Sequence, residues 1–393
     1  MQPLNVTAMT AVSAIGAGAA STLQALRSRR SGLRRCDFID IAEGYVGRVD
    51  ALETHSLPSP LRRFDCRNNR LADLALQTDG FADAVAIARR RYGADRIGVI
   101  VGTSTSGIQA GEAAYQARDP ATGRLPEGFD YRHTQDMFSL ADFVRSALDV
   151  HGPALVVSTA CASSARTFID AHQWIASGMC DAAVVGGADS LCAMTLRGFA
   201  SLELISPGAC RPCDANRDGI SIGEAAGFAL LESEGKDLAL IGYGASSDGH
   251  HMSAPHPRAL GAIAAMRAAL DAGDLSPDDI DYVNLHGTGT RANDAMEDIA
   301  MVEVFGTGTA CSSTKGWTGH TLGASGILEA LIARLCIEHR LIPGCLNIGA
   351  PDPEFQARVL CENEPRTVRR VMTNAFGFGG INCSLVFGYP GDR

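Results

Sequence analysis

A single cysteine stands where a predicted buried strand turns into a predicted helix. The segment VVSTACASSARTF sets Cys161 among small residues, which allow other backbone to approach it closely. A thiol at the N-terminus of a helix meets the positive end of the helix dipole and free N–H groups. We therefore expect its pKa to be lowered and an oxyanion hole to lie beside it. Most of the other cysteines, among twelve in all, are expected to be small buried residues. Cys161 is the candidate nucleophile.

A histidine follows another predicted strand, in the segment VNLHGTGTRANDAMED. The strand delivers His286 into a Gly/Thr loop, where Thr288 and Thr290 offer hydroxyl groups. A neutral imidazole in that position can donate a hydrogen bond to a developing oxyanion or enolate. Asp294 and Glu297 open the next predicted helix, where they either support the site or only complement the helix dipole.

A lysine and a second histidine share one loop, in SSTKGWTGHTLGASGILEALI. Lys315 and His320 precede a predicted helix in which Glu329 is placed to pair with the lysine. Of the 34 basic residues only two are lysine, so the chain uses arginine wherever a positive charge merely has to be solvated. Lys315 is therefore a candidate for a site that requires a compact ammonium group. A buried lysine–glutamate pair costs desolvation energy and is rarely present for stability alone.

Two further segments have suggestive glycine or cysteine spacings. TNAFGFGGINCSL predicts a flexible loop that presents N–H groups and can move an aromatic ring. It lacks the strand–GxGxxG–helix setting of a nucleotide site, so we predict no nucleotide cofactor. The pair Cys210 and Cys213 in CRPC leaves a redox or zinc-binding module open as an alternative. Because no second Cys/His pair accompanies it, we expect no metal.

Bulk composition excludes several other classes of protein. The net charge of −10 argues against a sequence-independent nucleic-acid binder, because there is no global positive field to displace phosphate counterions. We find no apolar run long enough for a membrane span, and the first residues lack the pattern of a signal peptide. Cysteines scattered through a long chain favour reduced thiols, so we expect a cytoplasmic protein.

Apolar runs predict buried strands in two series, at 98–101, 154–158, 182–187 and 227–232, and then at 238–244, 281–286, 370–376 and 383–388. Helical patterns follow Cys161 and occupy 259–272, 294–305 and 322–338. This alternation predicts an α/β fold. The two series meet at the polar segment ESEGKD, so we expect an N-terminal half of residues 1–235 and a C-terminal half of residues 236–393.

Taken together, these segments resemble the motifs of the β-ketoacyl-[acyl carrier protein] synthase I/II family of the thiolase-like superfamily. TACASS is similar to its nucleophile motif, HGTGT to its first histidine motif, K-x-x-x-x-H to its lysine and second histidine, and FGFGG to its gating loop. CRPCDANRDGISIGEAAG resembles the stretch before the last strand of the family's first half. The resemblance implies a thiolase-like fold of five layers, α-β-α-β-α, built from two similar halves.

The resemblance also implies a role for each catalytic candidate. Cys161 would carry the acyl group as a thioester. His286 and His320 would bind the thioester carbonyl of the malonyl carrier and assist its decarboxylation. Lys315, paired with Glu329, would support this cluster. The activity implied is a decarboxylative Claisen condensation with malonyl-[acyl carrier protein], in fatty acid or aryl polyene-type biosynthesis, and it requires neither metal nor cofactor.

Other positions take roles by the same resemblance. The backbone N–H groups of Cys161 and Phe378 would form the oxyanion hole, and Phe378 would gate the acyl pocket. The implied partners are an acyl carrier protein bearing acyl and malonyl groups and a second subunit, in a homodimer or in a heterodimer with a related ketosynthase-like chain. The further supporting residues are Thr288, Thr290 and Asp294. The acidic carrier protein is expected to dock on arginines near the entrance, with Arg62, Arg63, Arg67, Arg70 and Arg211 as candidates.

Two departures from the family pattern affect the expected pocket. Ala226 replaces a usual glycine, and Trp317 stands where a smaller residue is usual, which predicts a reshaped cavity beside the histidines. We expect the subgroup of aryl polyene or xanthomonadin-type pathways. The alternatives are a thiolase, which needs a second nucleophilic cysteine, and a chain-length-factor-like partner subunit of the same fold, which lacks the nucleophile.

Overall fold

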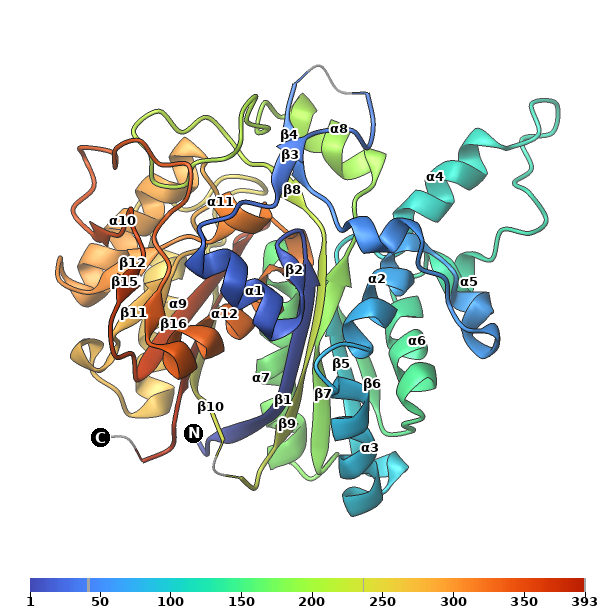
Figure 1. Ribbon diagram of the computed structural model, residues 1–393, viewed down its shortest axis with the longest axis horizontal. Coiled ribbons are helices and arrows are strands. Elements are labelled where there is room, and N and C mark those ends of the chain that lie inside the picture. Colours follow the sequence, from blue (N-terminus) through green and yellow to red (C-terminus); the bar gives the residue numbers. More distant parts are fainter. Residues whose placement is uncertain (41–42, 236, 392–393) are drawn as a thin grey trace.

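A computed structural model describes residues 1–40, 43–235 and 237–391 (Figure 1). Its largest sheet contains one five-stranded unit from the first part of the chain. The strand order is β6 (Ala154–Val157), β5 (Ile97–Gly102), β7 (Ala182–Asp189), β9 (Ala225–Glu232) and β1 (Leu4–Ser13). The first three are mutually parallel, whereas β9 runs antiparallel to both of its neighbours.

The second part of the chain repeats this arrangement. Its order is β12 (Ala310–Ser312), β11 (Tyr282–Asn284), β16 (Arg370–Gly377), β17 (Ile381–Gly388) and β10 (Ala239–Ser247), with β14 (Arg358–Val359) added outside β12. Again the first three are parallel and the last two pairings are antiparallel. Numbered within each unit, both follow the order 3-2-4-5-1. The units join where β1 pairs with β10, at Leu4 with Leu240 and Asn5 with Ala239.

Helices complete the five layers. Two of them, α7 (Ser163–Ala176) and α12 (Ser325–His339), lie in the central hydrophobic cluster with the inner faces of both units. One outer cluster contains α2 (Arg67–Leu76), α3 (Phe81–Tyr92) and α6 (Ser139–Leu148), and the other contains α9 (Leu260–Gly273) and α10 (Arg291–Phe305). Figure 1 shows these outer groups on opposite sides of the molecule. The predicted α/β architecture of five layers and two similar halves is confirmed.

The central position of α12 follows from its sequence. Along its length only Arg334, Glu338 and His339 escape burial, and a helix that is apolar nearly all round belongs inside a protein. The helix begins at Ser325 rather than at 322, because residues 322–324 form a tight 3-10 turn in which Leu322 has a φ of +52°. The predicted boundary between the halves falls at residue 236, which lies outside the described residues.

Smaller elements surround this body. A three-stranded sheet contains β3 (Leu33–Arg35), β4 (Tyr45–Gly47) and β8 (Ile222–Gly223), and β13 (Leu341–Ile342) pairs with β15 (Glu364–Pro365). The remaining elements are β2 (Gly16–Ala17), α1 (Gly18–Arg27), α4 (Ile108–Gln116), α5 (Tyr131–Thr134), α8 (Ala193–Ser201) and α11 (Lys315–Thr318). In Figure 1, α4 and the loop after it project from the body. None of the described helices is long and apolar enough to cross a membrane.

The environment of Arg67 contradicts its expected role in docking. Its side chain is 8% exposed, and its guanidinium binds both carboxylate oxygens of Glu224, with nitrogen–oxygen distances of 2.9 and 2.7 Å. A third contact, of 2.8 Å, reaches Glu53. Glu224 also accepts the N–H groups of Val49 and Leu191. The prediction that Arg67 meets the carrier protein is wrong, because the residue is part of a buried ion cluster.

We therefore predict that Arg67→Met lowers the free energy of unfolding by about 3–5 kcal/mol, since it leaves the Glu224 carboxylate buried without its cation. The matched control is Arg62→Met, at an exposed position five residues earlier in the sequence, which should change the free energy of unfolding by less than about 0.5 kcal/mol. Denaturant unfolding of both variants measures the difference. Equal stability of the two variants would contradict the buried role of Arg67.

Candidate active site

The candidate catalytic residues converge on one cavity of about 590 Å³. Cys161 comes from the first half, in the 3-10 turn Ala160–Ala162 between β6 and α7. His286 follows β11, and His320 follows α11. The sulfur of Cys161 and one imidazole nitrogen from each histidine all lie within 4.8 Å of one another. The roles expected for these residues from the family resemblance require that they lie together in this way.

A sharp turn presents the sulfur of Cys161. Ala160 has a φ of +50°, which is uncommon for a residue with a side chain, and α7 begins only two residues after the cysteine. Cys161 is 5% exposed, and it lines the cavity. A strained turn at this point aims the side chain at the cavity rather than along the helix.

The acidity of Cys161 differs from the expectation. Burial raises the pKa of its thiol to about 11, and Asp189 acts in the same direction. The positive charge of Lys315 and the N–H groups of Phe378 and of Cys161 itself lower that pKa, but by less. The prediction of a lowered pKa is therefore wrong for this structure, because removal of the sulfur from water outweighs the local donors.

Both imidazoles are neutral at neutral pH. Burial and the positive charge of Lys315 hold the pKa of His286 and of His320 well below the ordinary value. Their ring centroids are 5.2 Å apart and nearly perpendicular. The N–H of Leu322 donates to Nδ1 of His320 at 3.2 Å, so the proton of this neutral ring is on Nε2. The Ser325 hydroxyl lies 3.2 Å from the same Nδ1.

Two buried carboxylates accept hydrogen bonds from backbone N–H groups of the His286 loop. Glu297 accepts the N–H of His286 at 2.8 Å and that of Gly287 at 2.7 Å. Asp294 accepts the N–H of Gly289 at 3.2 Å and that of Cys213 at 2.9 Å. Burial raises the pKa of Glu297 to about 7, and the backbone donors oppose that rise. Both acids position the loop, so they are more than charges at a helix N-terminus.

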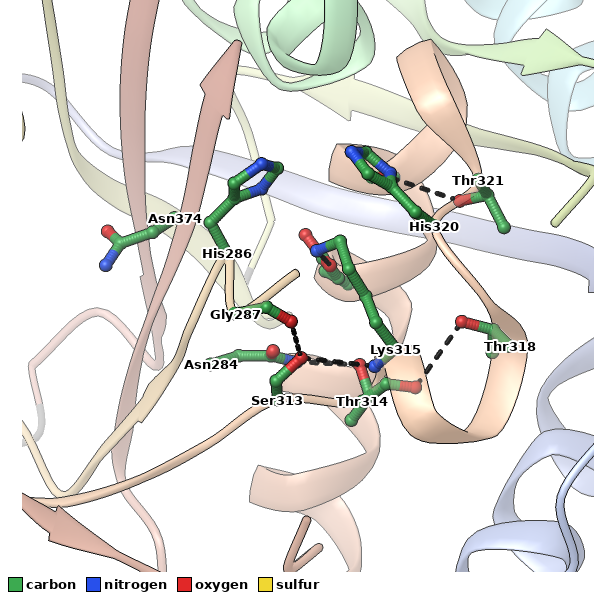
Figure 2. A network of polar contacts seen from close by, with 12 residues as sticks. Asn284, His286, Gly287, Ser313, Thr314, Lys315, Thr318, His320, Thr321 and Asn374 are labelled. Carbon is green, nitrogen blue, oxygen red and sulfur yellow. Dashed lines mark hydrogen bonds and ion pairs between the residues drawn. The ribbon is translucent and has the colours of Figure 1, made fainter. Parts of the chain in front are cut away.

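Lys315 lies under the two imidazoles, with its side chain directed toward them in Figure 2. Its ammonium group is 2.6 Å from Glu329, and both side chains are buried. The N–H of Lys315 donates to the Ser313 hydroxyl at 3.2 Å, and that hydroxyl donates to the carbonyl of Gly287 at 2.6 Å (Figure 2). The lysine loop and the His286 loop are therefore tied together. The predicted Lys315–Glu329 pair is present in this geometry.

The FGFGG loop covers the sulfur. The N–H of Phe378 lies against Cys161, while its ring is 36% exposed and packs 5.6 Å from the ring of Phe199. Gly379 and Gly380 follow with φ values of +85° and +77°, which glycine adopts without strain. Other residues of the cavity wall are Leu202, Leu204, Thr288, Thr290 and Asn382.

Sequence reasoning missed one buried group beside this cluster. Asp189 ends β7 and is fully buried, and its carboxylate reaches Gly323 in the turn after His320. Its only sequence signal is an acid at the end of an otherwise apolar strand in VVGGADS, a position at the edge of a parallel sheet where sites form.

One further expectation, for Trp317, changes in the structure. Trp317 is fully buried in the central cluster, where its indole N–H faces the carbonyl of Gly344. It does not line the cavity, so the prediction of a cavity reshaped by its bulk is wrong. Cys210 donates to the carbonyl of Lys315 at 3.1 Å. Among the described residues the group with metal-ligand spacing is the Cys161 trio, and the CRPC pair belongs to no such group.

Comparison with known proteins places the chain in a family. The model of the β-ketoacyl synthase N-terminal domain matches residues 1–236, and that of the C-terminal domain matches residues 238–349. The 3-oxoacyl-[acyl-carrier-protein] synthase 2 of Staphylococcus aureus is 30% identical over 404 residues, which cover 97% of this chain and all of that protein. The mitochondrial 3-oxoacyl-[acyl-carrier-protein] synthase of Arabidopsis thaliana is 41% identical over 259 residues, 60% of this chain and 56% of that protein.

Solved structures agree with these matches. The ketosynthase ApeO in complex with its chain length factor ApeC, from Xenorhabdus doucetiae, superimposes with a TM-score of 0.90 at 39% identity, covering 99% of this chain and 98% of that chain. A β-ketoacyl synthase from Burkholderia phymatum gives a TM-score of 0.87 at 28% identity, covering 99% of this chain and all of that one. With both family models matched and relatives aligned over nearly its whole length, the chain belongs to the β-ketoacyl synthase family.

Proposed function

We propose that the chain joins an acyl group, held as a thioester on Cys161, to the two-carbon unit of malonyl-[acyl carrier protein], releasing CO₂ and β-ketoacyl-[acyl carrier protein]. One observation carries the proposal: a thiol and two neutral imidazoles meet within 4.8 Å at the wall of a cavity. Nucleophile and hydrogen-bond donors at a developing negative charge are what this condensation requires.

The first step loads the enzyme. The sulfur of Cys161 attacks the carbonyl carbon of the acyl carrier thioester, the bond to the carrier's sulfur breaks, and the proton that leaves Cys161 ends on the departing carrier thiol. A thiol whose pKa is about 11 is mostly protonated at rest, and the thiolate is the nucleophile, so the sulfur must give up its proton as it attacks. The exchange of one thiol for another leaves the number of protons unchanged. The N–H groups of Phe378 and Cys161 face the oxygen that becomes negative.

The second step breaks and makes carbon–carbon bonds. Loss of CO₂ from the malonyl group leaves an electron pair as an enolate, whose oxygen accepts hydrogen bonds from the neutral imidazoles of His286 and His320. The enolate carbon then attacks the acyl carbonyl on Cys161, and the cysteine leaves as thiolate and takes up a proton. His320 supplies Nε2–H, since its Nδ1 already accepts the N–H of Leu322.

Lys315 supports this chemistry without touching it. Together with burial, its positive charge keeps both imidazoles neutral and therefore able to donate, and the same charge favours the thiolate that appears when the product leaves. Glu329 compensates its charge within the interior. Asp294 belongs to the same supporting set, with the hydroxyls of Thr288 and Thr290 at the cavity wall. Phe378, partly exposed on a glycine-rich loop, is placed to gate the cavity.

We also propose the partners. Solved relatives include a ketosynthase with its chain length factor and, at 22% identity, a type II ketosynthase complexed with its acyl-carrier protein. For this chain the carrier protein remains the proposed partner, with a homodimer or heterodimer as the assembly. The exposed Arg62 and Arg63, Arg70 beside Asp65, and Arg211 beside Asp218 stay candidates for docking. The aryl polyene subgroup stays a prediction.

The chain-length-factor alternative is the second candidate function. In that reading the chain binds a catalytic partner and shapes its product, which requires no nucleophile. The presence of Cys161 at the cavity, with both histidines and the buried lysine, favours the catalytic function.

The repeated strand order supports a division of the chain into halves of residues 1–235 and 236–393. Twelve free thiols support a cytoplasmic location.

We predict that alkylation of Cys161 by iodoacetamide accelerates about tenfold per pH unit between pH 7 and 9, because the thiolate fraction rises with pH until the pKa of about 11 is reached. Cys36 and Cys361 are less buried and would compete, so the experiment uses a variant in which both are alanine. Peptide mapping at each pH gives the rate. A plateau reached near pH 7 would show an acidic thiol instead.

Cys161→Ala should accept no acyl group and catalyse no condensation, while retaining part of the malonyl decarboxylation at the two histidines. The matched control is Cys361→Ala, which should behave as wild type. Intact-mass analysis after incubation with a panel of acyl carriers detects the acyl-enzyme, and released CO₂ measures decarboxylation. A wild-type protein that takes up no acyl group from any carrier, or a Cys161→Ala protein that condenses, would overturn the proposed function.

A further inference from the structure

Asp189 joins three segments that are far apart in the sequence. Its carboxylate accepts hydrogen bonds from the Thr103 hydroxyl at 2.7 Å and from the N–H groups of Ser104 and Thr105 at 2.8 and 2.9 Å. The hydroxyls of Ser104 and Thr105 also donate to it. Its Oδ2 accepts the N–H of Gly323, from the second half of the chain, at 2.6 Å. One side chain thus holds loops of both halves together.

All six donors are neutral N–H and O–H groups. A fully buried carboxylate loses its hydration, and only this complete set of hydrogen bonds offsets the loss. Replacing such a group by an apolar one of the same shape is often neutral for stability, so packing alone gives no reason for an acid here. The position of the acid beside Cys161 and the His320 turn points to a role in the site.

The contact with Gly323 reaches His320 through one residue. Leu322 has a φ of +52°, an uncommon conformation for a residue with a side chain, and its N–H is the donor to Nδ1 of His320. The next N–H, that of Gly323, is tied to Asp189. The packing is close: a Cβ on Gly323 would come within 2.7 Å of Oδ2 of Asp189.

We propose that Asp189 is a positioning residue for the condensation, latching the turn of Leu322 and Gly323 so that His320 is protonated on Nε2 and presents that proton to the cavity. We call the hydrogen bond between Asp189 and the N–H of Gly323 the latch, and its role depends on the proposed function of His320. It acts through the turn, and Asp189 itself touches no substrate. Without it, the Leu322 turn is free to relax, Nδ1 of His320 loses its donor, and the ring is free to change tautomer and orientation.

Asp189→Asn tests the latch with little change in shape. Its single carbonyl oxygen, in the place of Oδ1, can still accept from Thr103, from Thr105 and from the N–H of Ser104. Its NH₂ group, in the place of Oδ2, faces the N–H of Gly323, donor against donor, whereas the Ser104 hydroxyl beside it can turn to accept. We expect kcat for decarboxylation and condensation to fall about 100-fold, as a small displacement of a catalytic group does, with KM for malonyl carrier nearly unchanged.

Gly323→Ala provides a second route to the same effect. The added methyl group pushes Oδ2 of Asp189 away from the turn, although the aspartate itself is retained. The same loss of kcat is therefore expected. The control is Asp73→Asn, which alters another buried acid, in the outer helix α2, where it binds His55 and Gln77. Asp73→Asn should keep the wild-type kcat. Thermal unfolding gives the folded fraction of each variant, and kcat is expressed per folded enzyme.

Nitrogen-15 NMR of histidine-labelled protein reads the tautomer of His320 with no carrier present. We expect Nε2–H in the wild type and a mixture of tautomers in Asp189→Asn. An unchanged His320 tautomer, or a wild-type kcat per folded enzyme in either latch variant, overturns the latch. Because the NMR experiment needs no condensation, a wild-type enzyme inactive with every carrier would overturn the proposed function alone.

Discussion

The Lys315–Glu329 ion pair is the interaction on which the chemistry of the site depends. In the protein interior, an unpaired ammonium would lose its proton, and an unpaired carboxylate would gain one. The Lys315 ammonium lies 2.6 Å from the Glu329 carboxylate and places a positive charge beneath the cluster. That charge lowers the pKa of both imidazoles and opposes the rise in the pKa of Cys161. One buried cation thus acts on all three groups, adding to the effect of burial at the imidazoles and opposing it at the thiol.

The repeated topology explains how these groups meet. The three parallel strands of each unit end at the site. Strands at the same position in the two units end in, or lead into, residues of the site. Cys161 follows β6, and the Lys315 loop follows its counterpart β12. Asp189 ends β7, and Phe378 follows its counterpart β16. The carboxyl ends of parallel strands form one edge of a sheet, so two copies of the arrangement facing each other enclose a cavity between two sets of loops.

Sequence and structure agree where the chemistry is local. A thiol among small residues between a strand and a helix can be recognised from its neighbours, and a lysine in a chain that avoids lysine from the composition. The failures concern burial, which depends on distant segments. The pKa of Cys161 is raised because loops from the other half cover it, Arg67 is buried because Glu224 and Glu53 enclose it, and Trp317 turns into the core. Asp189 was missed because its partners are 85 and 134 residues away.

The place of β1 in the sheet has a consequence for biosynthesis. Apart from the short β2, which pairs with its end, its hydrogen-bonded partners are β9 and β10, more than two hundred residues later in the chain. β10 in turn pairs with β17 near the end of the sequence. β1 is therefore synthesised long before the strands that cover most of its length. Such long-range pairing folds slowly and leaves apolar strand edges open to misassembly in the meantime. The nascent chain is therefore most exposed to misassembly at β1 before the second half emerges.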